Sequence, residues 1–229
     1  MVILRKNAGA IEDPKVHSVG VIALGSHLEN HGPSLPIDID AKIAAHIAFQ
    51  SSLKSGAKFL GIIYPAHELD EINHGIHVPL NILKNNIINT LKSAQKFLQL
   101  EKIVIVNGHG GNLPLMNEIS SIEEAVNMPV ILNNEIVFLE GPHGGTGELS
   151  MGKVLGVLDQ SQVVNQCNLD EFEEVGLYGF TKARENDPNI DAGAKDIEEN
   201  GVFVDEEYGN ELFNKAIDSV LEDIKKLIN

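Results

Sequence analysis

The sequence predicts an α/β fold, a three-layer α/β/α sandwich with a mainly parallel sheet. Short apolar runs rich in β-branched residues alternate along the chain with longer segments whose apolar residues recur at helical spacing. The short runs are apolar on both faces, which is typical of parallel strands covered by helices on both sides. Because 229 residues with 43% hydrophobic content can bury one large core, we expect a single domain over residues 1–229.

Four segments predict strands and five predict helices. The strand segments are residues 18–25 (SVGVIALG), 57–64 (AKFLGIIY), 102–107 (KIVIVN) and 129–133 (PVILN). The helical segments are residues 40–53, 80–100, 114–126, a stretch beginning near 146, and 210–227. The last of these is amphipathic, so we expect it to cover the sheet.

The composition excludes several classes of protein. A formal net charge of −16 argues against nucleic acid and against anionic membrane surfaces as partners. No apolar run approaches the roughly 20 residues that span a bilayer, and the N-terminus lacks the apolar core of a secretion signal. The single cysteine, Cys167, cannot form an internal disulfide, which fits a reducing compartment. We therefore expect a cytoplasmic enzyme or small-ligand binder.

Much of the negative charge lies in one segment. Residues 170–211 contain 14 Asp or Glu against 3 Lys or Arg, and glycines recur through them. This pattern predicts long surface loops with short elements, forming a solvated acidic face. The global charge therefore does not forbid a phosphorylated substrate bound elsewhere.

Most histidines follow predicted strands. Seven of the nine lie just after a strand; His17 and His46 do not, and we interpret these two as structural. Open α/β sheets bind ligands beyond the carboxyl ends of their strands. The acidic and histidine side chains at these strand ends are Glu29, His31, His67, His74, His77, His109, His143 and Glu148. The sequence therefore predicts a site at that edge of the sheet.

Three loops carry the candidate chemistry. Glu29 and His31 lie two residues apart, so in extended backbone their side chains point to the same side. Asp40 lies where the next helix begins, and it is either the N-cap of that helix or a third ligand beside Glu29 and His31. Such side chains are ligands that first-row divalent metals prefer. His109 emerges from a strand between glycines, a poor position for core packing. His143 and Glu148 share a glycine-rich turn, where Glu148 could instead serve only the first helical turn.

The motifs in these loops resemble the creatininase (creatinine amidohydrolase) family. The pattern G-S-x-x-E-x-H-G-x-x-L-P-x-x-x-D stands at residues 25–40, N-G-H-G-G-N at 107–112, H-x-G-x-x-E-x-S at 143–150 and G-V-x-x-D at 201–205. They occur in the family's order over nearly the whole chain. The resemblance implies the fold predicted above and a metal-dependent amidohydrolase.

The resemblance also implies roles for single residues. Glu29, His31, Asp40 and His109 match the ligands of a site for one or two metal ions, with Asp40 as the bridging carboxylate. His143 matches the family's proton-transfer histidine. Creatininase has a further glutamate ligand where this chain has a glycine, at position 111. That departure puts the second ion in question unless Glu148 supplies the missing carboxylate; otherwise Glu148 acts as a base.

Part of the resemblance is to a subgroup of archaeal deformylases within the family. Residues 23–32, 74–77 and 146–150 carry it, and the absence of tryptophan counts against creatinine as substrate. It implies formate release from a phosphorylated formylamino-pyrimidine nucleotide, in riboflavin and deazaflavin coenzyme biosynthesis. It also implies Fe(2+) as the metal, with Zn(2+) or Mn(2+) as alternatives, and a homo-oligomer. The candidates for binding the phosphate are His74, His77, Asn112 and Lys182.

Other functions stay open at this stage. Another creatininase-like amidohydrolase, acting on creatinine or a peptide, would share every ligand and differ in its pocket. A non-catalytic homologue that binds metal or nucleotide is favoured by Gly111 but opposed by the otherwise intact ligand set. A purely structural protein would not need glycines around each histidine-bearing turn.

Overall fold

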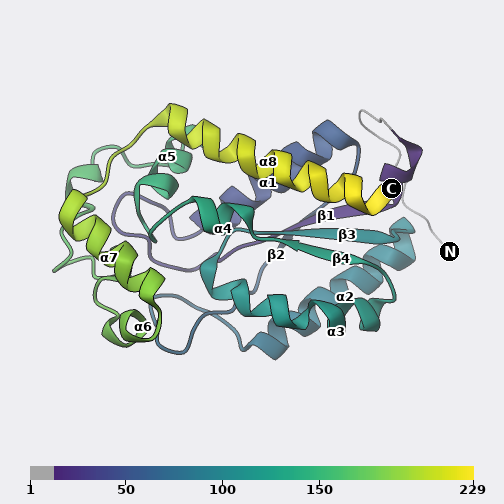
Figure 1. Cartoon of the computed structure of the whole chain (residues 1–229), viewed down its shortest axis with the longest axis horizontal. Coiled ribbons are helices and arrows are strands. Elements are labelled where there is room, and N and C mark those ends of the chain that lie inside the picture. The colour runs from purple at the N-terminus through teal and green to yellow at the C-terminus, as the bar shows by residue number, and fades with distance from the viewer. Residues whose placement is uncertain (1–12) are drawn as a thin grey trace.

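The computed structural model describes residues 13–229, which fold around one parallel sheet (Figure 1). Its four strands lie in the order β2-β1-β3-β4, and every neighbouring pair is parallel. The strands are β1 (Val19–Leu24), β2 (Lys58–Ile63), β3 (Lys102–Asn107) and β4 (Val130–Asn133). The four strands predicted from the sequence are confirmed to within one residue at each end.

Helices connect and cover the strands. The α-helices are α1 (Ile39–Ser55), α2 (Leu80–Leu98), α3 (Ile119–Val126), α4 (Glu135–Leu139), α5 (Thr146–Val154), α6 (Thr181–Asn186), α7 (Pro188–Asn200) and α8 (Glu206–Ile228). Short 3-10 helices are η1 (Pro14–Ser18), η2 (Gly110–Glu118), η3 (Val163–Asn165) and η4 (Val175–Leu177). No helix in residues 13–229 is long and apolar enough to cross a membrane.

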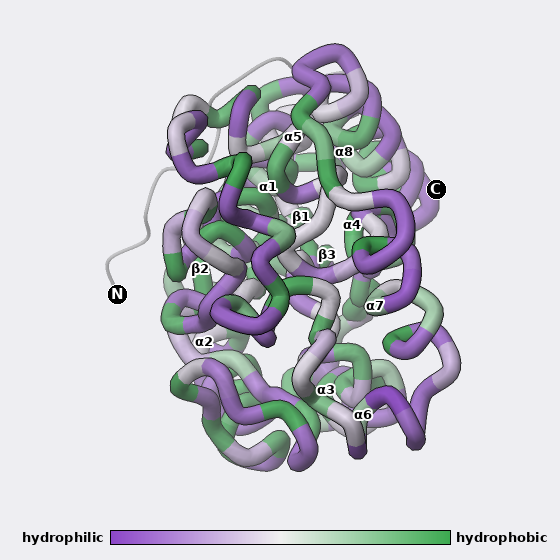
Figure 2. The backbone as a smooth tube through the Cα atoms, turned by 90° about the vertical axis from the view of Figure 1, so that its left-hand side faces the viewer, coloured by the Kyte–Doolittle hydropathy of each residue, from purple (hydrophilic) through white to green (hydrophobic). Residues whose placement is uncertain are grey.

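The predicted three-layer architecture is confirmed by how the strand side chains divide. Along β1, Val19, Val21 and Ala23 pack toward α1, α5 and α8, because alternate residues of a strand face opposite sides. Ile22 and Leu24 pack toward α2 and α3 on the other side. Figure 1 shows α8 and α1 along one face of the sheet and α2 and α3 along the other. In Figure 2 the apolar strands β1 and β3 lie inside more hydrophilic loops.

The strand order places a crevice between two loops. The chain leaves β1 toward α1 on one face of the sheet and leaves β3 toward η2 and α3 on the other face. The loops that follow β1 and β3 therefore diverge at adjacent strand ends, which is where open α/β sheets bind ligands.

Two local predictions are wrong. The helix expected over residues 114–126 is α-helical only from Ile119, where α3 begins. Residues 110–118 instead form the tighter 3-10 helix η2, which contains Pro114. Proline lacks the N–H that a regular helix uses, so Pro114 suits this irregular turn.

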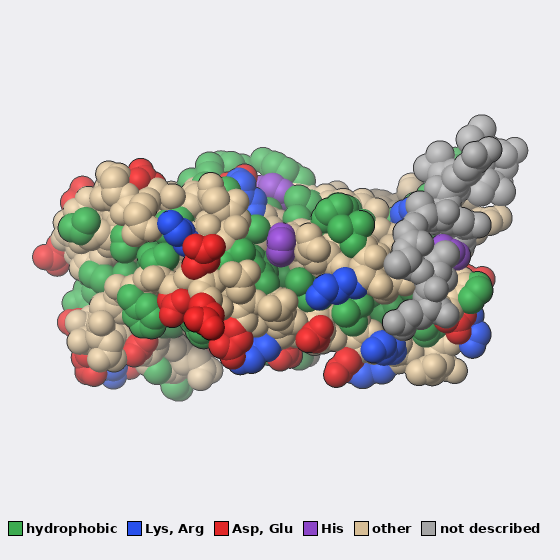
Figure 3. Space-filling view, turned by 90° about the horizontal axis from the view of Figure 1, so that it is seen from above, with side chains coloured by type: hydrophobic (Ala, Val, Ile, Leu, Met, Phe, Trp, Pro, Cys, Tyr) green, Lys and Arg blue, Asp and Glu red, His purple; other side chains and the backbone are tan. Residues whose placement is uncertain are grey.

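The acidic segment contains a 13-residue helix, α7, where loops were expected. Asp187 caps it by accepting a hydrogen bond from the N–H of Asn189, with Pro188 in the first helical position. Its buried face carries Ala194 and Ile197, whereas its acidic residues face solvent. On the surface seen in Figure 3, acidic side chains gather toward the end of the molecule where α7 lies in Figure 1.

Candidate metal centre

The loop after β1 carries three buried side chains that converge. Glu29, His31 and Asp40 are each at most 3% exposed. The His31 Nδ1 donates to the backbone carbonyl of Glu29 at 3.0 Å, which turns Nε2 toward Asp40 Oδ1 at 2.8 Å. The ligand atoms of the three residues lie within 4.8 Å of one another. Their arrangement fits a divalent cation, since a histidine fixed through one ring nitrogen is free to bind metal through the other.

Asp40 does not cap α1. That helix begins at Ile39, the N-cap position is Asp38, and no side chain caps it. The two oxygens of Asp40 instead face two histidines, His31 on one side and His109 on the other. The N-cap interpretation of Asp40 is therefore wrong, and its carboxylate lies where it could be shared between two ions.

His109 projects from the end of β3 into the same cluster. Its Nδ1 lies 3.0 Å from Glu29 Oε2 and 2.9 Å from Asp40 Oδ2, while its Nε2 donates to the carbonyl of His67 at 2.9 Å. Burial disfavours the charged ring, but the carboxylates of Glu29 and Asp40 outweigh it and raise the pKa of His109 well above its ordinary value.

His143 approaches the cluster from the turn before α5, and Glu148 approaches it from the first turn of that helix. The His143 Nε2 donates to the carbonyl of Asn30 at 2.7 Å, so its Nδ1 faces the cluster, 3.7 Å from Glu29 Oε1. Burial and the neighbouring His31 lower the pKa of His143 to about 3. Glu148 accepts a hydrogen bond from the N–H of Gly144 and lies 3.6 Å from His31 Nε2; burial raises its pKa to about 7. With a pKa of about 3, the His143 ring is neutral at pH 7.

The loop after β2 adds side chains that the sequence did not single out as ligands. An antiparallel bridge between Glu29 and Gly75 joins this loop to the first one. His74 Nε2 comes within 2.8 Å of Glu29 Oε1, and His77 Nε2 within 3.7 Å of Glu29 Oε2. Glu68 Oε2 lies 3.5 Å from His109 Nε2. The sequence placed the two histidines at a strand end, but nothing local distinguished Glu68 from its acidic neighbours.

Charge in the cluster is balanced by histidines alone. Within residues 13–229, no Lys or Arg forms an ion pair with Glu29, Asp40, Glu68 or Glu148. Burial opposes ionisation of Glu29, yet His109, His74 and His77 hold its pKa well below the ordinary value. Several buried carboxylates without a fixed cation are costly unless a positive ion joins them. The mixed oxygen and nitrogen donors therefore fit a divalent metal.

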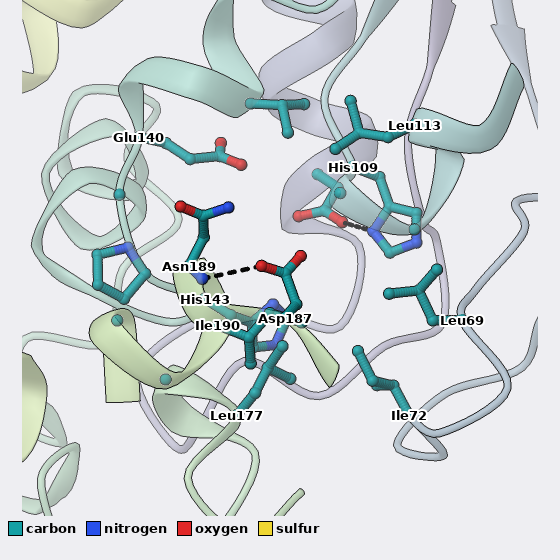
Figure 4. A pocket seen from close by; sticks show the side chains of 18 of the residues that line it. Leu69, Ile72, His109, Leu113, Glu140, His143, Leu177, Asp187, Asn189 and Ile190 are labelled. Carbon is teal, nitrogen blue, oxygen red and sulfur yellow. Dashed lines mark hydrogen bonds and ion pairs between the residues drawn. The ribbon is translucent and has the colours of Figure 1, made fainter. Parts of the chain in front are cut away.

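The cluster forms the floor of a cavity of about 520 Å³, a volume suited to a small-molecule ligand. Figure 4 shows apolar side chains on opposite walls, with the carboxyl of Glu140 directed inward near Asn189. The floor consists of Glu29, Asp40, Glu68, His109, His143 and Glu148, and the apolar walls of Leu69, Ile72, Leu113, Val137, Phe138, Leu177 and Ile190. No Lys or Arg of the described chain lines it.

One buried amide holds two loops of the site together. Gln166 is fully buried, and its Nε2 donates to the carbonyls of His31 at 2.7 Å and Gly144 at 2.8 Å. Its Oε1 accepts from the N–H of Ser34 at 3.2 Å. Gln166 therefore ties the loop that carries His31 to the turn that carries His143. Sequence reasoning missed it, because a glutamine in a polar stretch resembles a surface residue.

All six residues predicted for the site lie in this one cluster, whereas the four candidates for phosphate binding do not line the cavity. Both polar atoms of the Asn112 side chain are occupied by the N–H of His67 and the side chain of Asn107. His74 and His77 face Glu29, and Lys182 is exposed.

Comparison with known proteins agrees with this geometry. The family model described as "Creatininase: Creatinine amidohydrolase" matches residues 7–224. The chain belongs to the creatininase family. Solved creatininases share the fold: one titled creatinine amidohydrolase (creatininase) has a TM-score of 0.65 at 11% identity, with 91% of this chain and 90% of that chain covered. A mutant creatininase of "Zn-Zn type" has a TM-score of 0.63 at 14% identity over the same shares, and another title names manganese.

Other relatives are much more similar in sequence. A protein from Methanobrevibacter smithii is 64% identical over all 229 residues and all of its own length. Another, from Methanothermus fervidus, is 48% identical over 98% of this chain and 91% of its own. Both are named 2-amino-5-formylamino-6-ribosylaminopyrimidin-4(3H)-one 5'-monophosphate deformylase.

Proposed function

We propose that this chain is a metal-dependent amidohydrolase that releases formate from 2-amino-5-formylamino-6-ribosylaminopyrimidin-4(3H)-one 5'-monophosphate and leaves the 2,5-diamino product. The observation that carries the proposal is the deformylase name of a relative that is 64% identical over its whole length. The buried cluster of histidines and carboxylates below a ligand-sized cavity supports it chemically.

The proposed metal ligands are Glu29, His31, Asp40 and His109. Their two imidazoles and two carboxylates suit borderline divalent ions, and we propose Fe(2+) as the resident metal with Zn(2+) or Mn(2+) as substitutes. When bound, such an ion supplies a Lewis acid that polarises the formyl oxygen and makes water more acidic. The hydrogen bonds from His31 and His109 to backbone carbonyls fix the two rings for this task.

His143 and Glu148 are the proposed proton carriers. A formamide has a poor leaving group, so the departing nitrogen must be protonated as the C–N bond breaks. With its Nε2–H held by the Asn30 carbonyl, His143 presents the lone pair of Nδ1 to the cavity and can receive a proton there and pass it to nitrogen. The ligand atoms of His31, His143 and Glu148 lie within 4.8 Å of one another, a separation that one bridging water can span to relay a proton between Glu148 and His143. We assign Glu148 the role of accepting the proton of water.

The cavity walls suit the heterocycle. Apolar side chains such as Leu113, Phe138 and Leu177 line it, and a flat ring can pack between them. Glu140 is almost fully buried and its Oε2 has no hydrogen-bond partner. A buried polar atom without a partner is costly, so we propose that Glu140 binds the amino and ring N–H groups of the pyrimidinone.

The phosphate is proposed to lie away from the floor of the cavity. The carboxylates there would repel it, and no Lys or Arg among the described lining residues offsets them. The formyl group therefore points to the cluster, and the ribose phosphate points to the mouth.

We also propose that the chain forms a homo-oligomer. Strand β2 lies at the edge of the sheet, and Phe49, Leu53, Ile62 and Tyr64 on α1, β2 and the residue after it are exposed apolar side chains. Such side chains beside an open strand edge are typical of an interface. Light scattering coupled to size-exclusion chromatography measures the subunit number, and a monomer at micromolar concentration would contradict the proposal.

The decisive experiment is formate release from the formylamino-pyrimidine nucleotide. Protein purified without oxygen and reconstituted with Fe(2+), Zn(2+) or Mn(2+) is assayed with formate dehydrogenase, with creatinine and an N-formyl peptide in parallel. We expect formate from the nucleotide alone, with the highest rate for Fe(2+). No formate from protein with metal demonstrably bound would refute the substrate and favour another amidohydrolase of the family.

A further inference from the structure

The cavity has a polar pair near its mouth that the proposed chemistry does not use. Asp187 and Asn189 lie at the start of α7, and both line the cavity. Asp187 is partly exposed and Asn189 is exposed, whereas Glu140 is 8% exposed and Asp40 on the floor is 3% exposed. Exposure therefore rises from the floor, past Glu140, to the start of α7.

Capping of the helix uses only part of this pair. Asp187 Oδ1 accepts a hydrogen bond from the backbone N–H of Asn189 at 2.8 Å, which satisfies one of the free N–H groups at the start of α7. Within residues 13–229, neither Asp187 Oδ2 nor the side-chain amide of Asn189 has a hydrogen-bond partner. Figure 4 shows both side chains directed into the cavity. One carboxylate oxygen and one whole amide are therefore free to bind a ligand there.

The charges at this point favour neutral hydroxyl groups over an anion. The Asp187 carboxylate offsets the partial positive charge at the start of α7, and the described lining residues include no Lys or Arg. A phosphate beside Asp187 would be repelled, whereas a carboxylate oxygen accepts a hydrogen bond from an O–H. An amide both donates and accepts, so the pair can bind two neighbouring hydroxyls. Leu177 and Ile190 also line the cavity and offer apolar contact to the carbon atoms of a sugar.

The order of groups along the cavity matches the order of groups in the proposed substrate. The formyl group is proposed to lie at the floor, and the pyrimidinone against Glu140. The next group outward is the ribose, whose 2′- and 3′-hydroxyls are adjacent, and the phosphate follows it. Acidic side chains bind ribose hydroxyls in other nucleotide sites. The ribose is therefore the part of the substrate that would reach Asp187 and Asn189.

We propose that Asp187 and Asn189 bind the two ribose hydroxyls and so select a ribosylated pyrimidine over one that lacks them. The inference rests on the proposed function, because the ribose is part of the proposed substrate. It goes beyond that function by assigning specificity for the sugar to the start of α7, a role separate from holding metal or moving protons.

The test compares two substrates that differ only in these hydroxyls. Formate release by the metal-loaded full chain is measured from the ribosyl nucleotide and from its 2′,3′-dideoxyribosyl analogue. A hydrogen bond to a charged group contributes about 10–100-fold and one to a neutral group about 2–10-fold. We therefore expect the wild-type kcat/KM to be at least about 20-fold higher for the ribosyl compound, mostly through a lower KM.

Two variants separate ligand binding from helix capping. Asp187→Ser keeps an N-cap as good as aspartate but has no second oxygen for a ligand. We expect the ratio of kcat/KM between the two substrates to fall by about 10–100-fold in Asp187→Ser and by about 2–10-fold in Asn189→Ala. The kcat/KM for the dideoxyribosyl compound should stay at its wild-type value, because a loss of structure would slow both compounds alike.

Matched controls make the same changes outside the cavity. Asp205→Ser alters the N-cap of α8, and Asn200→Ala removes an amide at the other end of α7. Neither residue lines the cavity, so both variants should keep the wild-type ratio.

The outcomes distinguish this inference from the proposed function. A wild-type ratio below about 20-fold, an unchanged ratio in Asp187→Ser, or an equal loss for both compounds would overturn the ribose contacts and leave the deformylase activity standing. If the wild type releases no formate, the proposed function fails, and the dissociation constants of the same two compounds, measured by calorimetry, decide the inference. A ribosyl compound that binds no more tightly than the dideoxyribosyl one would then overturn it as well.

Discussion

Gln166 provides the sharpest test of how the site is assembled. Replacement by leucine keeps the approximate volume of the buried side chain but removes three hydrogen bonds, which involve the backbone of His31, Gly144 and Ser34. Each such bond contributes about 1 kcal/mol net, so we expect the free energy of unfolding to fall by about 3 kcal/mol. For a chain of this size that corresponds to a melting temperature lower by about 6–12 °C.

The assay is urea and thermal unfolding of the metal-free protein, followed by circular dichroism. Asn165→Leu is the matched control, since Asn165 is an exposed neighbouring amide. We expect metal affinity to fall in Gln166→Leu as well, because the loops that carry His31 and His143 lose their common anchor. A Gln166→Leu protein within about 0.5 kcal/mol of the wild type, in the range of ordinary surface substitutions, would refute the argument that this amide holds the loops together.

Four further predictions address the centre and its surroundings. His109→Ala should abolish formate release and reduce the amount of bound metal. The control is His46→Gln, which changes a histidine outside the cluster and should keep both. Retained turnover in His109→Ala would show that His109 is not a metal ligand. In Glu140→Gln, the stability of the metal-free protein should depend less on pH between 5 and 8. Burial and the nearby Glu148 and Asp40 raise the pKa of Glu140 well above its ordinary value. Because this carboxyl ionises at about pH 4.3 in the unfolded chain, the folded wild type loses stability as pH rises past that value. The same dependence of unfolding free energy on pH in both proteins would contradict this prediction. Gly147→Ala should destabilise by several kcal/mol or prevent folding, because its Cβ would overlap the carbonyl oxygen of Glu140; wild-type urea unfolding would show that this turn relaxes freely. Chelation should end activity and lower the melting temperature, since an ion at 100 times its Kd adds about 2.7 kcal/mol, and an unchanged melting curve would mean that no ion stabilises the fold.

Features that depend on neighbouring residues were predictable from the sequence. Each strand is a continuous apolar run, and the two-residue alternation of β1 distributes its side chains between two helix layers, so the architecture followed from periodicity. Because parallel strands end at one edge, Glu29, His109 and His143 could also be expected near each other. The helix α7 was not predicted, because its N-cap and its two buried apolar residues are a weak helical signal. The glycines and acidic residues of this segment are the stronger signal, and they indicate loops.

Contacts between distant loops were decided by the tertiary structure alone. Glu68 reaches His109 because the loop after β2 bridges to Glu29 through Gly75, and no residue near Glu68 records that pairing. Gln166 in the same way contacts a loop more than 130 residues earlier in the chain. The sequence thus determined the fold and most of the chemistry at the strand ends, through local periodicity and spacing. Which carboxylate stands beside which histidine depends on where whole loops pack, and only the folded chain decides that.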